Sequence, residues 1–326
     1  MDRRAVASER GWQTVKGWRI VKITLIAFLV LANIFMLWFL QSVIRSAEYL
    51  PEETIRQARE LLRADGIVIG QRVVDAKKVD LPIFEGGLVE DYHASVAVKL
   101  SGCDVSLTFD APNGVVISME NGDRFTFSDG FDIRYAAGGS PELRVMDPEA
   151  VASLQPLTAD EEENAHKAVA SLLSKAGAVT SERRQDAYRL YTFVNCGRDD
   201  ANGVLYCVAE QLVDRRPLVD FRAVFAISDG KVVGMNGSWC FASTDGVYSA
   251  QLLDQINILY SVRNRILEER GDISDSREEI LSLEIGYAVY FRSDTESFYL
   301  IPAWIVRCAS GKTYSINAVD GTLYTK

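Results

Sequence analysis

The sequence predicts an α+β fold, in which an N-terminal transmembrane helix precedes an ectodomain of repeated helix plus antiparallel β-sheet units. Three observations predict this class. A long apolar stretch lies near the N-terminus, at residues 23–44. After it, a segment with helical spacing of apolar residues is followed by alternating strands and turn dipeptides. That order recurs three times at a period of about one hundred residues, so the repeats are domain-sized and differ from those of a solenoid.

The apolar stretch carries no formal charge between Ile23 and Ile44. As a helix it is about 33 Å long at ~1.5 Å per residue, against a hydrocarbon core of roughly 30 Å. A helix satisfies its own backbone hydrogen bonds, so it can cross a layer that holds no water. Residues 23–44 are therefore predicted to span a membrane once. The polar residues that interrupt the stretch are Thr24, Asn33, Gln41 and Ser42.

The charges on either side of this segment predict its direction. Residues 1–22 form a basic leader of charge +4, from six basic residues against Asp2 and Glu9. Arg45 alone follows the segment, and three glutamates come within the next eight residues. Basic residues are retained on the cytoplasmic side. The N-terminus is therefore predicted to be cytoplasmic, and the C-terminal ectodomain extracytoplasmic, at the cell membrane.

A cleaved signal peptide is the alternative for the same segment. Its apolar core would be about 7–15 residues long and would end at a small-x-small cleavage site. The core here is longer, and the residues that follow it, IRSAEY, match A-x-A poorly. The uncleaved anchor is therefore favoured.

The ectodomain is acidic. Subtracting the +4 of the leader and the +1 of Arg45 from the net charge of −10 leaves −15 on residues 46–326. No basic stripe is present to neutralise phosphates, which argues against nucleic acid as a partner. The same charge argues against a body that lies flat on anionic lipid.

Three α+β units are predicted, at residues 45–145, 157–244 and 245–326, with boundaries near 138–157 and 242–248. Each opens with a helix. The first, 51–64, has Pro51 in its first turn and a stripe of Ile55, Ala58 and Leu62. The second has a capping box of Thr158 and Glu161, and Gly177 ends it. The third is predicted from Ser249 to Arg270. The stripe of the second helix is Ala165, Ala168, Val169, Leu172 and Leu173.

Strands follow each helix, separated by Asn-Gly, Asp-Gly and Ser-Gly turns. In the first unit they are predicted at His93–Leu100, Asp104–Phe109, Val115–Met119 and Arg124–Phe127, with turns at Asn121-Gly122 and Asp129-Gly130. In the second unit they are predicted at Tyr188–Cys196, Val204–Gln211 and Phe221–Ile227, then at Val232 and Val233. In the third unit they are predicted at Glu284–Phe291, Phe298–Cys308 and Thr313–Ala318.

Five cysteines are widely spaced, and outside the membrane a disulfide is chemically allowed. Cys196 and Cys207 are the candidates, since one hairpin is predicted to join them. If its loop is Asp200–Gly203, the two residues lie opposite each other and can bridge. If Asn202-Gly203 is instead a two-residue turn, Cys196 faces Ala209. Buried free thiols are the other interpretation.

The sequence predicts no enzyme, no cofactor and no metal site. Its two histidines, His93 and His166, lie in no nucleophile signature, and no G-x-S-x-G, P-loop, H-E-x-x-H or S-x-x-K motif is present. The loop at Arg198–Gly203 resembles the start of a calcium loop. An EF-hand needs acids at its first and twelfth positions, which here hold Arg198 and Ala209.

Asn33 is the one polar group in the middle of the predicted span. An amide there costs free energy unless it has a partner, and interhelical hydrogen bonds contribute on the order of 1 kcal/mol. Ala27 and Ala32 are small residues that permit close approach of another helix. These three residues are the candidate contact with a second membrane helix. The alternative is a hydrogen bond from Asn33 within its own helix.

Several segments together suggest a family. The anchor ends in NIFMLWFL and leads into LPEETIRQARELLRADGIVI; QLVDRRPLVDFRAVFAISDGKVVG and a C-terminal YLIPAWIVRCASGKTYSINAVDGTLY follow later. In layout the chain resembles the YycI/YycH family of two-component system regulatory proteins, YycI more than YycH. The match is strongest over the first sixty and the last thirty residues, and the ending is also similar to PepSY-type domains.

The resemblance implies a non-enzymatic single-pass protein on the outer face of the cytoplasmic membrane of a Gram-positive-type bacterium. Family members bind a WalK-like sensor histidine kinase, often beside a YycH-like sister protein, and tune a cell-wall programme largely through the membrane helix. A PepSY-like module that restrains an extracytoplasmic peptidase is the alternative function. An envelope hydrolase with an unfamiliar site is a third.

Overall fold

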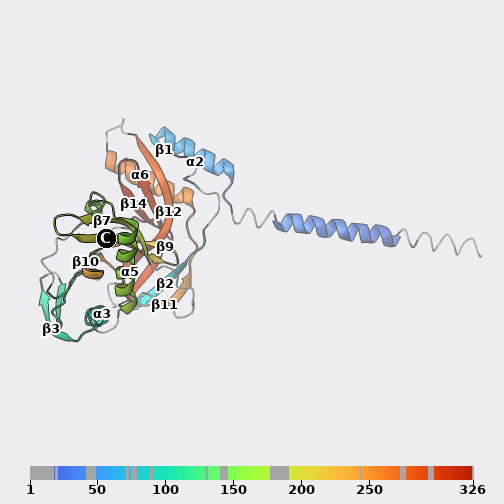
Figure 1. Cartoon of the computed structure of the whole chain (residues 1–326). Coiled ribbons are helices and arrows are strands. Elements are labelled where there is room, and N and C mark those ends of the chain that lie inside the picture. The colour runs from blue at the N-terminus through green and yellow to red at the C-terminus, as the bar shows by residue number, and fades with distance from the viewer. Residues whose placement is uncertain are drawn as a thin grey trace, which may run out of the picture. The chain divides into compact units, whose positions relative to one another are not determined.

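Figure 1 shows the computed structural model of the chain, which divides into two compact units. The first comprises Met1–Glu60 with Asp75–Lys78, and the second comprises Leu61–Val74 with Val79–Lys326. Most of the leader, the end of the predicted span, the Asp129-Gly130 turn, Gly177 and the start of the strand predicted from Tyr188 lie outside the described residues. Described are Trp18 and residues 21–41, 49–70, 73–74, 79–88, 91–112, 114–128, 131–139, 146–176, 191–242, 244–271, 277–292 and 297–324.

The first unit contains one helix, Val21–Gln41, that is long and apolar enough to cross a membrane. None of its apolar window is buried by other described residues. Helix α2 (Glu52–Ala64) begins in this unit and ends in the second. Its predicted apolar face is confirmed, because Ile55, Ala58 and Leu62 are all buried.

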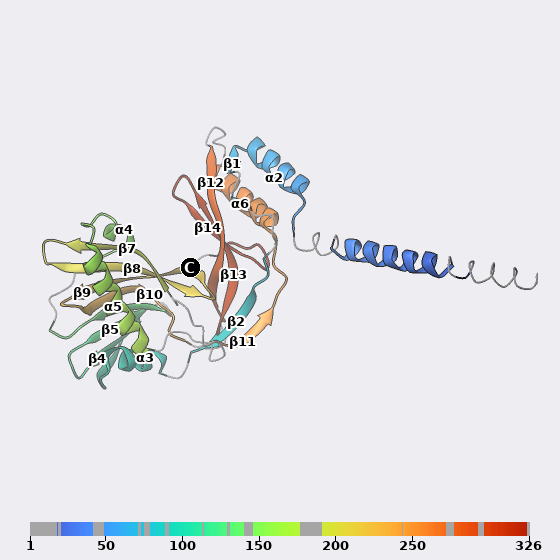
Figure 2. The same cartoon turned by 45° about the vertical axis from the view of Figure 1, so that its right-hand side comes forward.

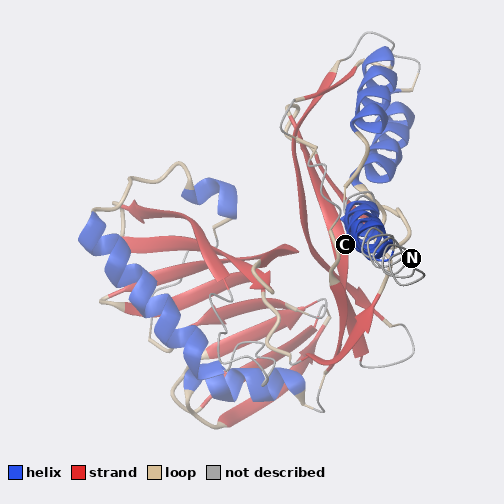
Figure 3. Ribbon diagram, turned by 90° about the vertical axis from the view of Figure 1, so that its right-hand side faces the viewer, coloured by secondary structure: helices blue, strands red, loops and turns tan. Residues whose placement is uncertain are grey.

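Eight strands of the second unit form a continuous antiparallel section, in the order β7-β8-β9-β10-β6-β5-β4-β3. Helices α3 (Tyr92–Ser101) and α5 (Ala159–Ala176) lie across it and contact each other (Figure 3). The short helix α4 (Pro148–Val151) contacts β7, β8 and β9. The strands are β3 (Val105–Ala111), β4 (Gly114–Met119), β5 (Arg124–Ser128), β6 (Asp132–Ala136), β7 (Tyr191–Asp199), β8 (Val204–Val213), β9 (Arg216–Ser228) and β10 (Lys231–Ser238).

The remaining strands form a C-terminal section around the long β12–β13 hairpin (Figure 2). β14 and β2 pair with β13, β11 pairs with β2, and β1 runs parallel to β12. Helix α6 (Gln255–Arg270) lies against β14. β9 joins the two sections where Leu218 pairs with Tyr287 of β12. The strands are β1 (Ile67–Ile69), β2 (Pro82–Gly87), β11 (Thr244–Ser249), β12 (Glu278–Phe291), β13 (Ser297–Cys308) and β14 (Thr313–Asn317).

A mixed α+β architecture rich in antiparallel strands is thus present, but the predicted repetition of three units is not confirmed. β2, from the first predicted stretch, pairs with β13 and β11 of the later stretches. β6, also from the first stretch, pairs with β10 of the second. The strands of the three stretches therefore share one hydrogen-bonded network. The boundaries near 138–157 and 242–248 stay predictions.

Two predicted elements are wrong. The strand predicted at His93–Leu100 is instead part of helix α3. Its buried residues, Tyr92, Val96, Ala97 and Leu100, follow helical spacing, and Gly102 ends the helix with its N–H donated to Val98 O.

The other error concerns the start of the third helix. It was predicted at Ser249, but α6 begins at Gln255, where the Asp254 carboxylate accepts the Asn257 N–H at 3.0 Å. Residues 244–249 are instead β11, which pairs with β2. This partner lies more than 150 positions away in the sequence, so helical spacing alone did not reveal it.

Most other described elements match their predictions, with ends that shift by a few residues. In α5 the five residues of the predicted stripe are all buried. The helix contacts β8, β9 and β10 with this face. Burial of such a stripe is what holds an amphipathic helix on a sheet.

Candidate functional site

In the helix Val21–Gln41, the candidate partner residues Ala27, Ala32 and Asn33 are all exposed. Asn33 Nδ2 donates to Leu29 O, one turn earlier, at 2.9 Å. The amide therefore satisfies one N–H within its own helix. At about 100° per residue, Ala32 lies about 100° and Ala27 about 120° around the helix from Asn33, so the three side chains do not share one face. The contact with a second membrane helix stays a prediction.

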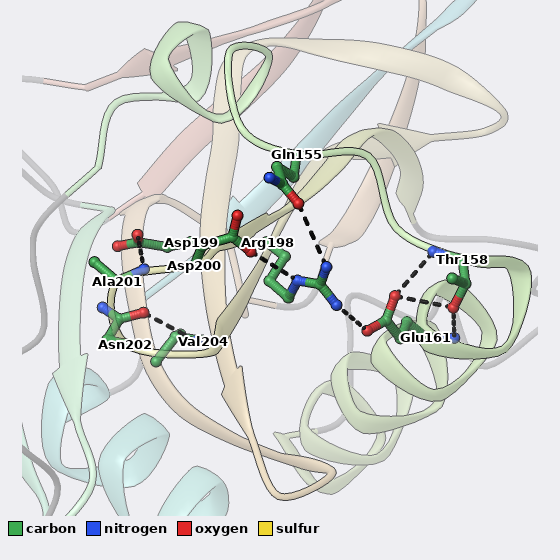
Figure 4. A network of polar contacts seen from close by, with 9 residues as sticks. All are labelled: Gln155, Thr158, Glu161, Arg198, Asp199, Asp200, Ala201, Asn202 and Val204. Carbon is green, nitrogen blue, oxygen red and sulfur yellow. Dashed lines mark hydrogen bonds and ion pairs between the residues drawn. The ribbon is translucent and has the colours of Figure 1, made fainter.

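A polar site lies in the second unit, where the start of α5 meets the β7–β8 hairpin (Figure 4). The predicted capping box opens α5. Thr158 Oγ1 accepts the Glu161 N–H at 3.3 Å, and Glu161 Oε2 accepts from Thr158 N and Oγ1, each at 2.9 Å. These bonds satisfy backbone donors that the first helical turn leaves without partners.

Arg198 of β7 connects this helix start to the hairpin. It donates to Glu161 Oε1 at 2.8 Å, to Asp200 Oδ1 at 3.1 Å and to Gln155 Oε1 at 3.4 Å. Hydrogen bonds from the Thr158 backbone and hydroxyl, followed by the charge of Arg198, lower the pKa of Glu161. The arginine and the glutamate are each about one third exposed, so this ion pair orients the hairpin more than it stabilises the fold.

The hairpin loop sets the strand register. Ala201 N donates to Asp199 Oδ1 at 3.1 Å, and Val204 N donates to Asn202 Oδ1 at 2.9 Å. The loop therefore spans Asp200–Gly203, and Asp199 pairs with Val204. Side-chain to backbone bonds of this kind favour tight loops.

This register places Cys196 directly opposite Cys207, and the two form a disulfide with their Cα atoms 4.2 Å apart. The other three cysteines are free thiols. Burial raises the pKa of the Cys240 thiol to about 12 and that of Cys308 to about 11, so both stay protonated near neutral pH. Cys103 is half-buried.

His166 lies beside the disulfide. Its ring stacks on Phe193 of β7 at 3.7 Å between centroids, and its Nε2 lies 3.6 Å from Cys196 Sγ. The sequence placed His166 on the second helix but gave no sign of this contact, because the two residues are 30 positions apart. A hairpin register and a helix orientation together bring them into contact.

A hollow of about 600 Å³ lies between α5, the ends of strands β7, β8 and β9, and the turn from β9 to β10. Side chains of both signs line it, including those of Glu161, Lys167, Arg198 and Asp229. No histidine or cysteine is among the described lining residues. The hollow therefore offers hydrogen-bond donors and acceptors for a polar ligand or a partner's side chains.

Together, the fold and the site define an α+β protein with a disulfide-linked hairpin, whose described residues include one apolar helix long enough to cross a membrane. No protein-family model and no curated protein matches the chain. Among solved structures it is similar to an uncharacterized protein from Eubacterium rectale ATCC 33656, with 10% sequence identity and a TM-score of 0.48. That similarity covers 80% of this chain and 91% of the other.

Proposed function

We propose that this chain is a single-pass membrane protein, with its N-terminus in the cytoplasm, that binds a sensor histidine kinase and modulates its output. The observation that supports the proposal best is the helix Val21–Gln41. Its side chains are exposed, and none of its apolar window is buried within the described chain. Such a surface requires lipid or another apolar helix around it.

Asn33 supplies the specific contact in this proposal. Its amide has further donor and acceptor capacity beyond the single bond to Leu29 O. In hydrocarbon, an interhelical hydrogen bond from such a group contributes on the order of 1 kcal/mol. Ala32, about 100° away around the helix, is a small residue that permits the kinase helix to approach the flank of this face.

In the proposed mechanism, the membrane helix of this chain regulates the kinase by binding one of its two states better than the other. A helix packed beside the kinase spans can shift a two-state balance only by its difference in affinity for the two states. Coupling free energies of about 1–3 kcal/mol are the ordinary scale. The acidic ectodomain then provides a further contact with the kinase or a sister protein, and cell-wall metabolism is the proposed output.

Co-purification from native membranes tests this proposal. We expect a histidine kinase to co-purify with the full chain, and replacement of residues 23–44 by poly-Leu to abolish both co-purification and the effect on kinase output. Asn33→Leu is the finer variant, and about a fivefold loss of association corresponds to ~1 kcal/mol. Gln41→Leu, a polar residue at the end of the same helix, is the matched control and should leave association unchanged.

Unchanged kinase output from an inserted poly-Leu variant would refute the transmembrane mechanism. Recovery of a mature protein that lacks the apolar helix would instead show that the segment is a signal peptide. Inhibition of a neighbouring secreted peptidase by the full chain, with no effect on any kinase, would favour the PepSY-like alternative.

A further inference from the structure

Three metal-binding side chains meet at the corner of α5 and the β7–β8 hairpin. The His166 imidazole and the sulfurs of Cys196 and Cys207 lie with their ligand atoms within 4.8 Å of one another. The two sulfurs are joined as a disulfide. Reduction would turn the same three groups into two thiols and an imidazole, of which His166 and Cys196 are half-buried and Cys207 is buried.

The spacing of these atoms fits tetrahedral zinc. With Zn–S of about 2.3 Å and Zn–N of about 2.0–2.1 Å, tetrahedral angles put a nitrogen and a sulfur ligand about 3.6 Å apart. His166 Nε2 lies 3.6 Å from Cys196 Sγ, so this pair already has the required separation. Two sulfur ligands of one zinc ion would be about 3.8 Å apart. The Cα atoms of Cys196 and Cys207 are 4.2 Å apart across the strands, so rotation of the two side chains can bring the sulfurs to that separation.

The surroundings hold the ring in place and leave it accessible. Phe193 stacks on the His166 ring with an interplanar angle of 7°, which fixes the orientation of Nε2. The His166 side chain is 31% exposed and Cys196 is half-buried, so an ion can enter from solvent. Glu162 Oε1 lies 3.8 Å from His166 Nε2 and places a negative charge beside the position of the cation.

We propose that reduction of the Cys196–Cys207 disulfide creates a zinc site of two cysteine thiolates and His166, with water in the fourth position. Histidine with two cysteines is a ligand set that zinc accepts, and it suits a site with one open position. The inference goes beyond the proposed function and does not depend on the membrane helix or on any kinase.

The redox step balances with a dithiol as the reductant. The dithiol gives two electrons and two protons to the protein disulfide, the S–S bond breaks, and the reductant leaves as its own disulfide. Zinc binding then releases the two thiol protons to solvent, because the ligands are thiolates. Oxidation by the reverse exchange expels the metal and restores the disulfide.

The test uses the full chain in detergent, oxidised or reduced with a phosphine that is then removed. Zinc binding is measured by competition with a chromophoric chelator, and Co²⁺ is added as the spectroscopic probe. We expect one equivalent of metal on the reduced protein, with sulfur-to-cobalt charge-transfer absorption, and none on the oxidised protein. His166→Gln keeps both cysteines and should lower the affinity at least about tenfold and change the cobalt spectrum.

Cys103→Ser is the matched control, since it removes a half-buried free thiol elsewhere and should bind as wild type. Cys196→Ser should abolish binding. An unaltered affinity in His166→Gln, binding to the oxidised protein, or loss of binding in Cys103→Ser would each overturn the proposal. Loss of the cooperative unfolding transition on reduction would also count against it, because the site requires the folded hairpin.

Discussion

At the scale of single residues, Thr158 shows how one hydroxyl defines a helix start. Its Oγ1 accepts the Glu161 N–H, while the Glu161 carboxylate accepts the Thr158 N–H. The pattern of Thr followed three residues later by Glu predicts this geometry from local sequence alone, because both partners lie within one helical turn.

Thr158→Ala should therefore destabilise the protein by about 1 kcal/mol, the usual cost of losing a threonine cap. Urea unfolding followed by circular dichroism measures the change. Ser174→Ala is the matched control, because it removes an exposed hydroxyl in the last turn of the same helix, away from the cap, and should be neutral or slightly stabilising. Equal losses in the two variants would contradict the capping role.

Glu269 of α6 illustrates a charge whose effect depends on pH. Its carboxylate accepts from Lys312 Nζ at 2.9 Å and from the Tyr314 hydroxyl at 3.0 Å, and Arg265 Nε lies 2.8 Å away. The hydrogen bond from Lys312, then that from Tyr314 and the two positive charges, lower the pKa of Glu269. These groups connect α6 to the turn before β14.

Because the folded-state pKa of Glu269 is depressed, its contribution to stability is present above the unfolded value near 4.5 and is lost as the pH falls through the lower folded value. We expect Glu269→Gln to show a smaller drop in unfolding free energy between about pH 6 and about pH 3 than wild type. Glu268→Gln, at a more exposed neighbour on the same helix, is the control and should follow wild type. Parallel curves for wild type and Glu269→Gln would disprove the assignment.

At the scale of elements, α3 and α5 differ in how far the sequence predicts them. The α5 stripe has helical spacing from Ala165 to Leu173 within a helix of eighteen residues, and the helix forms where it is predicted. Helix α3 has only ten residues in which a helical pattern can show, and small and apolar residues are mixed within them. A run this short fits a strand or a helix, and contacts with α5 and β4 select the helix.

The packing of α5 on the sheet predicts the effect of a cavity. Leu173 is 2% exposed and lies on the face of α5 that contacts the strands. Leu173→Ala should lower the free energy of unfolding by about 2–5 kcal/mol, because it removes buried methyl groups and leaves a void. Leu173→Met, which conserves volume, should cost less than about 1.5 kcal/mol. A Leu173→Ala protein as stable as Leu173→Met would show that the helix is loosely packed.

At the scale of the whole second unit, the pairing of β9 with β12 joins the two sheet sections. Gly286 of β12 lies at this junction, where a Cβ would be 2.3 Å from Pro217 O and 3.1 Å from Ile305 Cδ1. Two strands approach closely there only because no side chain separates them. The junction thus depends on one glycine that has no unusual backbone angle.

Gly286→Ala should destabilise the protein by about 1–3 kcal/mol, since the added methyl group pushes on the backbone of β9. Gly87→Ala in β2 is the matched control, because a Cβ there meets nothing within 4 Å, and its effect should stay within about 0.5 kcal/mol. Chemical unfolding measures both. Equal stability of the two variants would mean that β9 moves aside without cost.

The sequence by itself determined the apolar helix, the cap and stripe of α5, and most hairpins, because each depends on residues within one helix or one turn. The sequence left open which of two registers Cys196 and Cys207 adopt, and the structure has the four-residue loop that places them opposite each other. Only the tertiary structure decided that β2 and β11 join the C-terminal section, that α3 is a helix, and that His166 meets the disulfide. These features come from contacts between residues far apart in the chain, and local spacing carries no information about such partners.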